Sequence, residues 1–183
     1  MNYIERFLSQ RKPMINAQSC CIRWYRQINE EYRVLSWLLN AVMANVKNLD
    51  LHISIASGSH LTLPSSLLCC TSLESLDMSF HDNGIAILKT PSSFATLRSP
   101  SPLKELQLES VRIDESFGNW ISSHCKLLKK LTLNDVKGTT RIVITGSSLD
   151  MLAISSHDDC LSHLHVSAEI LPTFSFSLEI RFP

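Results

Sequence analysis

The chain has 183 residues, of which 17 are basic and 17 are acidic, so its formal net charge is zero. A length of this order predicts one domain, and a balanced charge without long basic runs argues against a dedicated nucleic-acid surface. The sequence has only 5 glycines and contains neither a G-x-G-x-x-G nor a P-loop string, so it gives no support for a phosphate-binding loop.

The first part of the chain predicts a helix, a strand and a second helix. Residues 3–9 carry apolar side chains at helical spacing, and residues 18–25 are compatible with a strand. The strongest helical pattern runs from Glu30 to Met43, with acidic residues in its first turn, where they favour the positive end of the helix dipole. Its apolar stretch, residues 34–44, is interrupted by polar residues and too short to span a bilayer, so we expect no membrane segment.

One pattern then recurs through the rest of the chain. L-x-x-L-x-L-x-x-V occurs at residues 103–111 and again at 128–136, and weaker copies of its first part begin at Val46, Leu73 and Leu149. The second apolar position of the five copies falls at residues 49, 76, 106, 131 and 152, which gives steps of 27, 30, 25 and 21. This spacing is typical of leucine-rich repeats, in which each repeat is one short strand plus a helix or loop.

The segments between the copies predict the remaining elements. Residues 56–71 read as a loop that ends in a short turn, and the Ser/Pro-rich residues 92–102 read as a surface loop or insertion. Residues 114–125 have apolar side chains at helical spacing, and residues 141–145 alternate like a strand.

The L-x-L core determines the expected fold. Side chains of a strand alternate between its two faces, so the leucines point inward, and repeats must stack because one repeat cannot bury its apolar face alone. We therefore predict an α/β leucine-rich-repeat solenoid, a curved parallel sheet with helices and loops on the convex side. The expected domain spans residues 1–183, with 1–45 as an N-terminal helical or capping repeat, 46–166 as repeats and 167–183 as a C-terminal tail.

Several stretches resemble plant F-box/leucine-rich-repeat proteins of the FBD-associated type. They are residues 30–37, 41–43, 45–51, 63–73 and 106–111, and residues 4–9 look like the segment that follows the F-box in that family. The resemblance implies that the repeats hold a protein substrate, while the F-box of such proteins docks a cullin-based ubiquitin ligase. Many members add a C-terminal FBD domain.

The function implied is a protein-protein interaction module that resembles the substrate-recognition repeats of an F-box ubiquitin-ligase subunit. The resemblance implies that its partner is a protein, which could be a substrate for ubiquitylation. The chain begins almost at the first repeat and stops at Pro183, so we expect neither an F-box nor an FBD segment in it, and no direct docking to the ligase adaptor. The alternatives are a stand-alone leucine-rich-repeat scaffold and a truncated, non-functional fragment, neither with a ubiquitin-ligase role.

If the leucines point inward, the residues between them line the concave face, which is the surface that solenoids use for binding. The residues expected to contact a partner there are Asp50, His52, Asp77, Glu105, Gln107, Glu109, Lys130, Thr132 and Asn134. The acidic members favour a basic partner. For each single residue the alternative is an ordinary solvated sheet face.

Two groups of residues have side chains that are candidates for catalysis or metal binding. Residues 157–160, His-Asp-Asp-Cys, together with His163 and His165, have metal-ligating side chains, but their spacing matches no standard zinc motif, so we expect no metal and no cofactor. His124 and Cys125 are adjacent on a predicted helix and project in different directions, so they do not form a nucleophile–base pair. The sequence therefore predicts no enzyme, although a metal-dependent or thiol enzyme stays as the weakest alternative.

The cysteines indicate the cellular compartment. The six of them form no C-x-x-C motif, and the N-terminus shows no secretory pattern. We expect reduced cysteines and an intracellular protein, in the cytoplasm or the nucleus.

Overall fold

The computed structural model describes residues 18–28, 31–91, 100–146, 148–156, 161–168 and 171–178 of the chain. The helix predicted for residues 3–9 lies outside this part. The elements in chain order are β1 (Ser19–Ile28), α2 (Glu31–Met43), β2 (Asn48–Ile55), β3 (His60–Leu63), η1 (Ser65–Leu67), β4 (Ser75–His81), β5 (Ile85–Leu88), β6 (Glu105–Glu109), β7 (Val111–Ile113), α3 (Phe117–His124), β8 (Lys130–Asn134), β9 (Arg141–Thr145), β10 (Met151–Ser156), β11 (His163–Ser167) and β12 (Thr173–Leu178).

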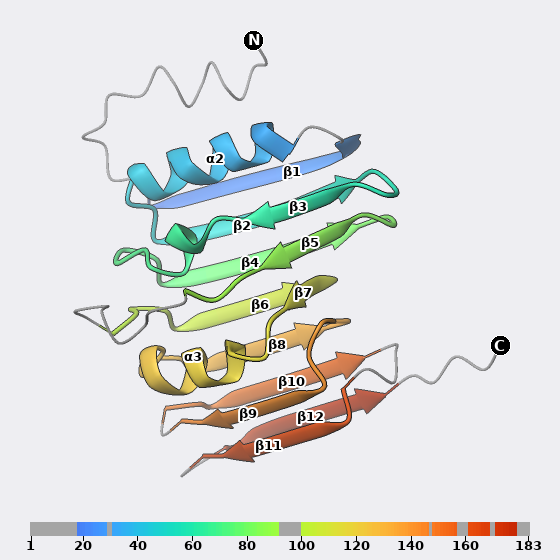
Figure 1. The fold of residues 1–183 in the computed structure, drawn as a ribbon. Coiled ribbons are helices and arrows are strands. Elements are labelled where there is room, and N and C mark those ends of the chain that lie inside the picture. The colour runs from blue at the N-terminus through green and yellow to red at the C-terminus, as the bar shows by residue number, and fades with distance from the viewer. Residues whose placement is uncertain are drawn as a thin grey trace, which may run out of the picture.

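The main sheet has seven strands, all paired in parallel, in the order β1-β2-β4-β6-β8-β10-β12 (Figure 1). The five copies of the motif form β2, β4, β6, β8 and β10 in succession, and burial alternates through the L-x-L core of each as the spacing predicts. The α/β leucine-rich-repeat class with a parallel sheet is therefore confirmed. The predicted helices at 30–43 and 114–125 are also present, as α2 and α3.

The sheet extends beyond the repeats on both sides. β1, from the segment expected to cap the repeats, pairs with β2 in the same parallel register, from Ser19 opposite Asn48 to Trp24 opposite Ile53. β12, from the segment expected to be a tail, pairs with β10 along its whole length. The chain therefore uses seven strands where the motif alone predicts five.

A second layer of short parallel strands lies on one side of the main sheet, with β3, β5 and β7 in one group and β9 and β11 in another (Figure 1). The sequence predicts β9 but otherwise only helices and loops on this side, and it assigns β3 to a loop. Leu61 and Leu63 of β3 are buried, and its hydrogen-bonded partner is β5 of the next repeat. Strands this short form only when the repeats stack, so their local sequence signal is weak. We call this side of the main sheet the helix side, because α2 contacts β3 and α3 contacts β9 there.

The core fills the space between the two layers. The inward residues of the motif strands are at most 2% exposed, namely Leu49, Leu51, Leu76, Met78, Leu106, Leu108, Leu131, Leu133, Leu152 and Ile154. The helices add Trp37, Phe117 and Trp120, each fully buried. Gly118 lets α3 approach β9, because a Cβ at this position would lie 2.5 Å from the carbonyl oxygen of Val143.

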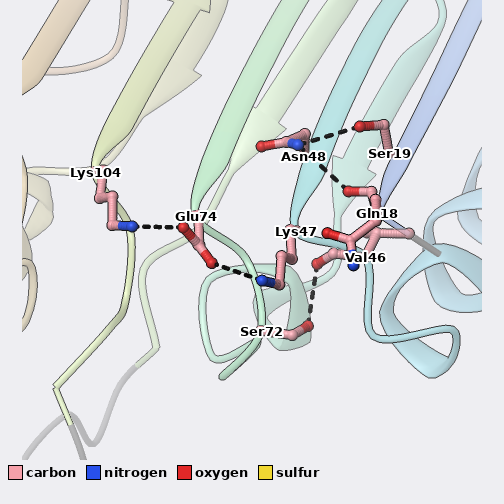
Figure 2. Close-up of polar contacts among 8 residues, drawn as sticks. All are labelled: Gln18, Ser19, Val46, Lys47, Asn48, Ser72, Glu74 and Lys104. Carbon is pink, nitrogen blue, oxygen red and sulfur yellow. Dashed lines mark hydrogen bonds and ion pairs between the residues drawn. The ribbon is translucent and has the colours of Figure 1, made fainter. Parts of the chain in front are cut away.

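Neighbouring repeats are also joined where the strands begin. The carbonyl of Lys47 accepts hydrogen bonds from the backbone N–H groups of Glu74 and Ser75 at 2.7 and 2.9 Å, and the carbonyl of Glu74 accepts those of Lys104 and Glu105 at 2.7 and 3.2 Å. The side chains follow the same order, since the Glu74 carboxylate lies between Lys47 Nζ at 3.4 Å and Lys104 Nζ at 2.6 Å (Figure 2). This arrangement fixes the register of each strand against the previous one.

Ser72 and Asn48 add side-chain links at the same end of the strands. Ser72 Oγ donates to the Val46 carbonyl at 3.0 Å, and Asn48 Nδ2 donates to Ser19 Oγ at 3.1 Å (Figure 2). Both bonds cross from one repeat to its neighbour.

The alternation in β6 can be tested by two truncations. Leu106 is 1% exposed, so Leu106→Ala is expected to lower the free energy of unfolding by about 2–5 kcal/mol. Gln107 points to the opposite face, and Gln107→Ala is expected to stay within about 0.5 kcal/mol of the wild type. Urea denaturation measures both values, and equal losses at the two positions would show that the facing of β6 is wrong.

Candidate functional site

The outward residues of the main sheet form one continuous surface on the side opposite the second layer, which we call the polar face. All nine residues expected to contact a partner lie on it, because they alternate with the inward residues along the motif strands. Glu105 is exposed and the other eight are half-buried.

The parallel register sorts the polar face into three rows that cross all seven strands. The entry row, nearest the start of the strands, is Ser19, Asn48, Ser75, Glu105, Lys130, Met151 and Thr173. The middle row is Cys21, Asp50, Asp77, Gln107, Thr132, Ala153 and Ser175. The exit row is Arg23, His52, Ser79, Glu109, Asn134, Ser155 and Ser177. Charged and long polar side chains thus gather over β1 to β8, while β10 and β12 contribute small residues to the middle and exit rows.

Asp50 is already engaged by its neighbours on the polar face. It accepts hydrogen bonds from Arg23 Nη2 at 2.9 Å and from Cys21 Sγ at 3.2 Å, and its other oxygen lies 2.8 Å from His52 Nε2. Burial acts to raise the pKa of this carboxyl, but the hydrogen bonds from Cys21 and Arg23 and the nearby His52 outweigh it and hold the pKa below its usual value. Asp50 therefore stays ionised and is largely neutralised within the sheet.

Asp77, its neighbour in the middle row, is in the opposite situation. Among the residues that the structure describes, none donates a hydrogen bond to the buried Oδ1 of either aspartate, but Asp50 Oδ1 lies 2.8 Å from His52 Nε2. Burial raises the pKa of this carboxyl, and the negative charges of Asp50 and Glu109 raise it further. His52 and Lys130 act to lower the pKa, but the net shift is upward. Folding therefore holds a carboxylate at the centre of the polar face at a cost in stability.

A histidine pair and a serine lie beside these carboxylates on the polar face. The rings of His52 and His81 stack, with centroids 6.3 Å apart and an interplanar angle of 28°. Ser79 lies next to them with no exposed surface; its hydroxyl donates to Glu109 Oε2 at 2.9 Å and lies 3.3 Å from His81 Nε2.

A comparison with known protein families identifies the repeats. The family model described as FBD-associated F-box protein At5g56370, LRR repeats, matches residues 34–174, which is most of the chain. The chain belongs to this family. The resemblance seen in the sequence is thereby confirmed, and a family of leucine-rich repeats indicates a protein-interaction module. No curated protein and no solved structure matches the chain.

Several residues of the polar face could not be predicted from the L-x-L motif. Cys21 and Arg23 come from β1, which lacks the L-x-L motif, and only the alternation of Cys20, Ile22 and Trp24 could have indicated them. His81 lies at the end of β4, beyond the motif. Ion pairs such as Arg23–Asp50 join strands that are distant in sequence, so they have no local signal.

The other candidate residues lie away from the polar face. Residues 157–160 are outside the described part of the chain, and His163 and His165 are exposed on β11. In the ranges that the structure describes, no group of three or more His, Cys, Asp or Glu side chains is arranged to hold a metal ion. Burial raises the pKa of the Cys125 thiol to about 12, so it stays protonated at neutral pH and is a poor nucleophile. None of the described helices is long and apolar enough to cross a membrane.

The contrast between the two aspartates predicts opposite effects of the same substitution. Because the folded-state pKa of Asp77 is raised above its usual value near 3.8, the ionised form costs stability above that pH. Asp77→Asn is therefore expected to raise the free energy of unfolding at neutral pH, by less than about 1 kcal/mol because solvent screens a partly exposed group. The gain should vanish as the pH falls below 3.8.

Asp50→Asn is the matched control. The pKa of Asp50 is lowered, so its carboxylate contributes stability above 3.8 that is lost as the pH falls through the folded-state pKa. This variant should be less stable than the wild type at neutral pH and approach it in acid. Urea denaturation across this pH range measures both variants, and changes of the same sign at neutral pH would contradict the electrostatic assignment.

Proposed function

We propose that the chain binds a protein partner through the polar face and serves as the substrate-recognition repeats of an F-box ubiquitin-ligase subunit. The observation that carries the proposal is the Asp77 carboxylate, which is held in the middle row without a hydrogen-bond donor to its buried oxygen among the described residues. Natural sequences tend to violate local stability rules at functional sites, and a partner that donates to Asp77 would satisfy this oxygen.

The charges of the polar face favour a basic partner segment. Asp50 is neutralised by Arg23, whereas Asp77 is not, and Glu105 is exposed in the neighbouring entry row. Glu109 accepts a hydrogen bond from Ser79 Oγ at 2.9 Å and lies in the exit row next to Asp77. A Lys or Arg side chain placed over the middle row would lie near all three carboxylates, where charge complementarity supplies both specificity and rate of association.

The ligase role rests on the family. Its members are F-box proteins by description, and the part matched by this chain is the repeats. We propose that the bound protein is a ubiquitylation substrate and that binding takes place inside the cell. Cys21, Cys69, Cys70 and Cys125 are free thiols, which is consistent with a reducing compartment. The F-box of such a subunit would supply the adaptor contact.

Binding can be tested with one substitution at the centre of the face. Gln107 lies in the middle row between Asp77 and Thr132, so Gln107→Arg would place a positive charge where we expect the partner's cation. The variant is expected to bind the partner at least about tenfold more weakly, as loss of complementarity at the centre of an interface does. The partner is first captured from plant extract with the wild-type chain, and its affinity for purified wild type and variant is then measured by calorimetry.

Gln18→Arg makes the same chemical change just before β1, outside the middle row. Gln18 is exposed, and its backbone carbonyl, which the substitution keeps, accepts hydrogen bonds from the backbone N–H groups of Lys47 and Asn48 and from Asn48 Nδ2. This variant should bind like the wild type, and circular dichroism should show both variants folded. Equal affinity of Gln107→Arg and the wild type would overturn the proposed site.

The ligase role needs a separate measurement. The chain is fused behind an F-box segment and expressed in plant cells together with the captured partner. We expect the partner to be ubiquitylated and its level to fall with the wild-type chain and not with Gln107→Arg. Binding without any ubiquitylation would favour the stand-alone scaffold over the ligase subunit.

A further inference from the structure

The inward side chains of the main sheet are exposed at β12, the final strand in the part of the chain that the structure describes. Phe174 and Phe176 of β12 are in register with Leu152 and Ile154 of β10, so they occupy core positions of the repeat. Leu152 is 0% and Ile154 is 2% exposed, whereas Phe174 is 52% and Phe176 is 46% exposed. The difference arises from the order of strands in the sheet. β10 has a neighbouring strand on both sides, whereas β12 has one only on the β10 side among the described residues.

The outer edge of β12 also carries backbone groups that can pair. The Thr173 N–H donates to the Asp150 carbonyl, so the backbone groups of Thr173, Ser175 and Ser177 face β10. Those of Phe174 and Phe176 then face the outer edge, since backbone groups alternate sides along a strand. In the ranges that the structure describes, no strand pairs with this edge.

Within β12 itself the edge lacks the residues that usually protect an edge strand, although Pro172 directly precedes it. Natural proteins block such edges with charged residues, proline or bulges. The strand Thr173–Leu178 reads TFSFSL and contains no charged residue, no proline and no glycine. An uncharged edge strand with two exposed phenylalanines is suited to pairing with another strand.

The sequence of β12 points to a second copy of itself as that strand. Thr173-Phe174-Ser175-Phe176-Ser177 is nearly symmetric about Ser175. If two copies meet antiparallel around a two-fold axis at Ser175, Phe174 of one lies opposite Phe176 of the other, and the outward-facing backbone groups of these residues bond each other. The phenylalanines then pair on the core side and Ser175 meets its own counterpart on the polar face.

We propose that the outer edge of β12 is a homodimerisation surface, at which two chains join their main sheets by antiparallel pairing centred on Ser175. The surface of a two-fold dimer must be self-complementary, and a symmetric, uncharged strand satisfies this condition. Pairing continues the packing that already holds the repeats, because Phe174 and Phe176 become covered as Leu152 and Ile154 are. The polar face over β1 to β8 stays open for a different partner.

Charge substitutions at the two-fold axis test the proposal. Ser175 is exposed on the polar face, so Ser175→Lys and Ser175→Glu leave the core intact but place two like charges opposite each other, which destabilises a strand pair. In sedimentation equilibrium on the full chain, the wild type is expected to form a dimer, each variant alone a monomer, and an equimolar mixture of the two variants a dimer again. Ser57→Lys, at an exposed turn far from β12, should dimerise like the wild type.

A cross-link gives a second readout that does not depend on affinity. Residues opposite each other in a non-hydrogen-bonded antiparallel pair have Cα atoms about 4.5 Å apart, which a disulfide can bridge. Oxidised Ser175→Cys should therefore give a dimer in which a disulfide joins the two substituted positions, identified by mass spectrometry, whereas Ser177→Cys should not link to itself. A wild-type monomer would overturn the proposal, as would an open-ended assembly or a dimer that survives in Ser175→Lys while Ser175→Cys forms no such disulfide.

Discussion

The parallel register between neighbouring repeats is the constraint on which the rest of the structure depends. A strand shifted by one residue would exchange its two faces, so Leu106 and Leu108 would leave the core and Gln107 would enter it. The register is fixed twice, by the backbone bonds at the strand entries and by the shared burial of the leucines. The three rows of the polar face are a direct consequence of it.

The same constraint explains the unfavourable electrostatic environment of Asp77. The register places it beside Asp50 and Gln107, and Asp50 has already taken up Arg23 and Cys21 from β1. Asp77 therefore remains a charged side chain in the middle of the sheet whose ionised form is disfavoured by burial and by its neighbours. In a fold stabilised by leucines, a carboxylate with a perturbed pKa at the centre of a sheet face is a candidate for contact with a partner, as we propose for Asp77.

The sequence predicts those parts of the fold in which local pattern and tertiary packing agree. The motif strands, α2, α3 and β9 follow from apolar spacing alone, and so do the nine residues of the polar face. The strands β3, β5 and β7 could not be predicted, because three- or four-residue strands gain their hydrogen bonds only from the next repeat. Arg23, Cys21 and His81 were missed for a related reason, since their roles depend on contacts across strands and not on a motif.

A double-mutant cycle tests the register most directly. Leu106 and Leu131 lie opposite each other in adjacent strands, whereas Leu106 and Leu152 are two strands apart, which is roughly 10 Å at the usual strand spacing. Unfolding free energies of the single and double alanine variants should give a coupling energy of about 0.5–3 kcal/mol for Leu106 with Leu131, and additive effects for Leu106 with Leu152. Additive effects for Leu106 with Leu131, together with coupling for the distant pair, would contradict the register and with it the three rows of the polar face.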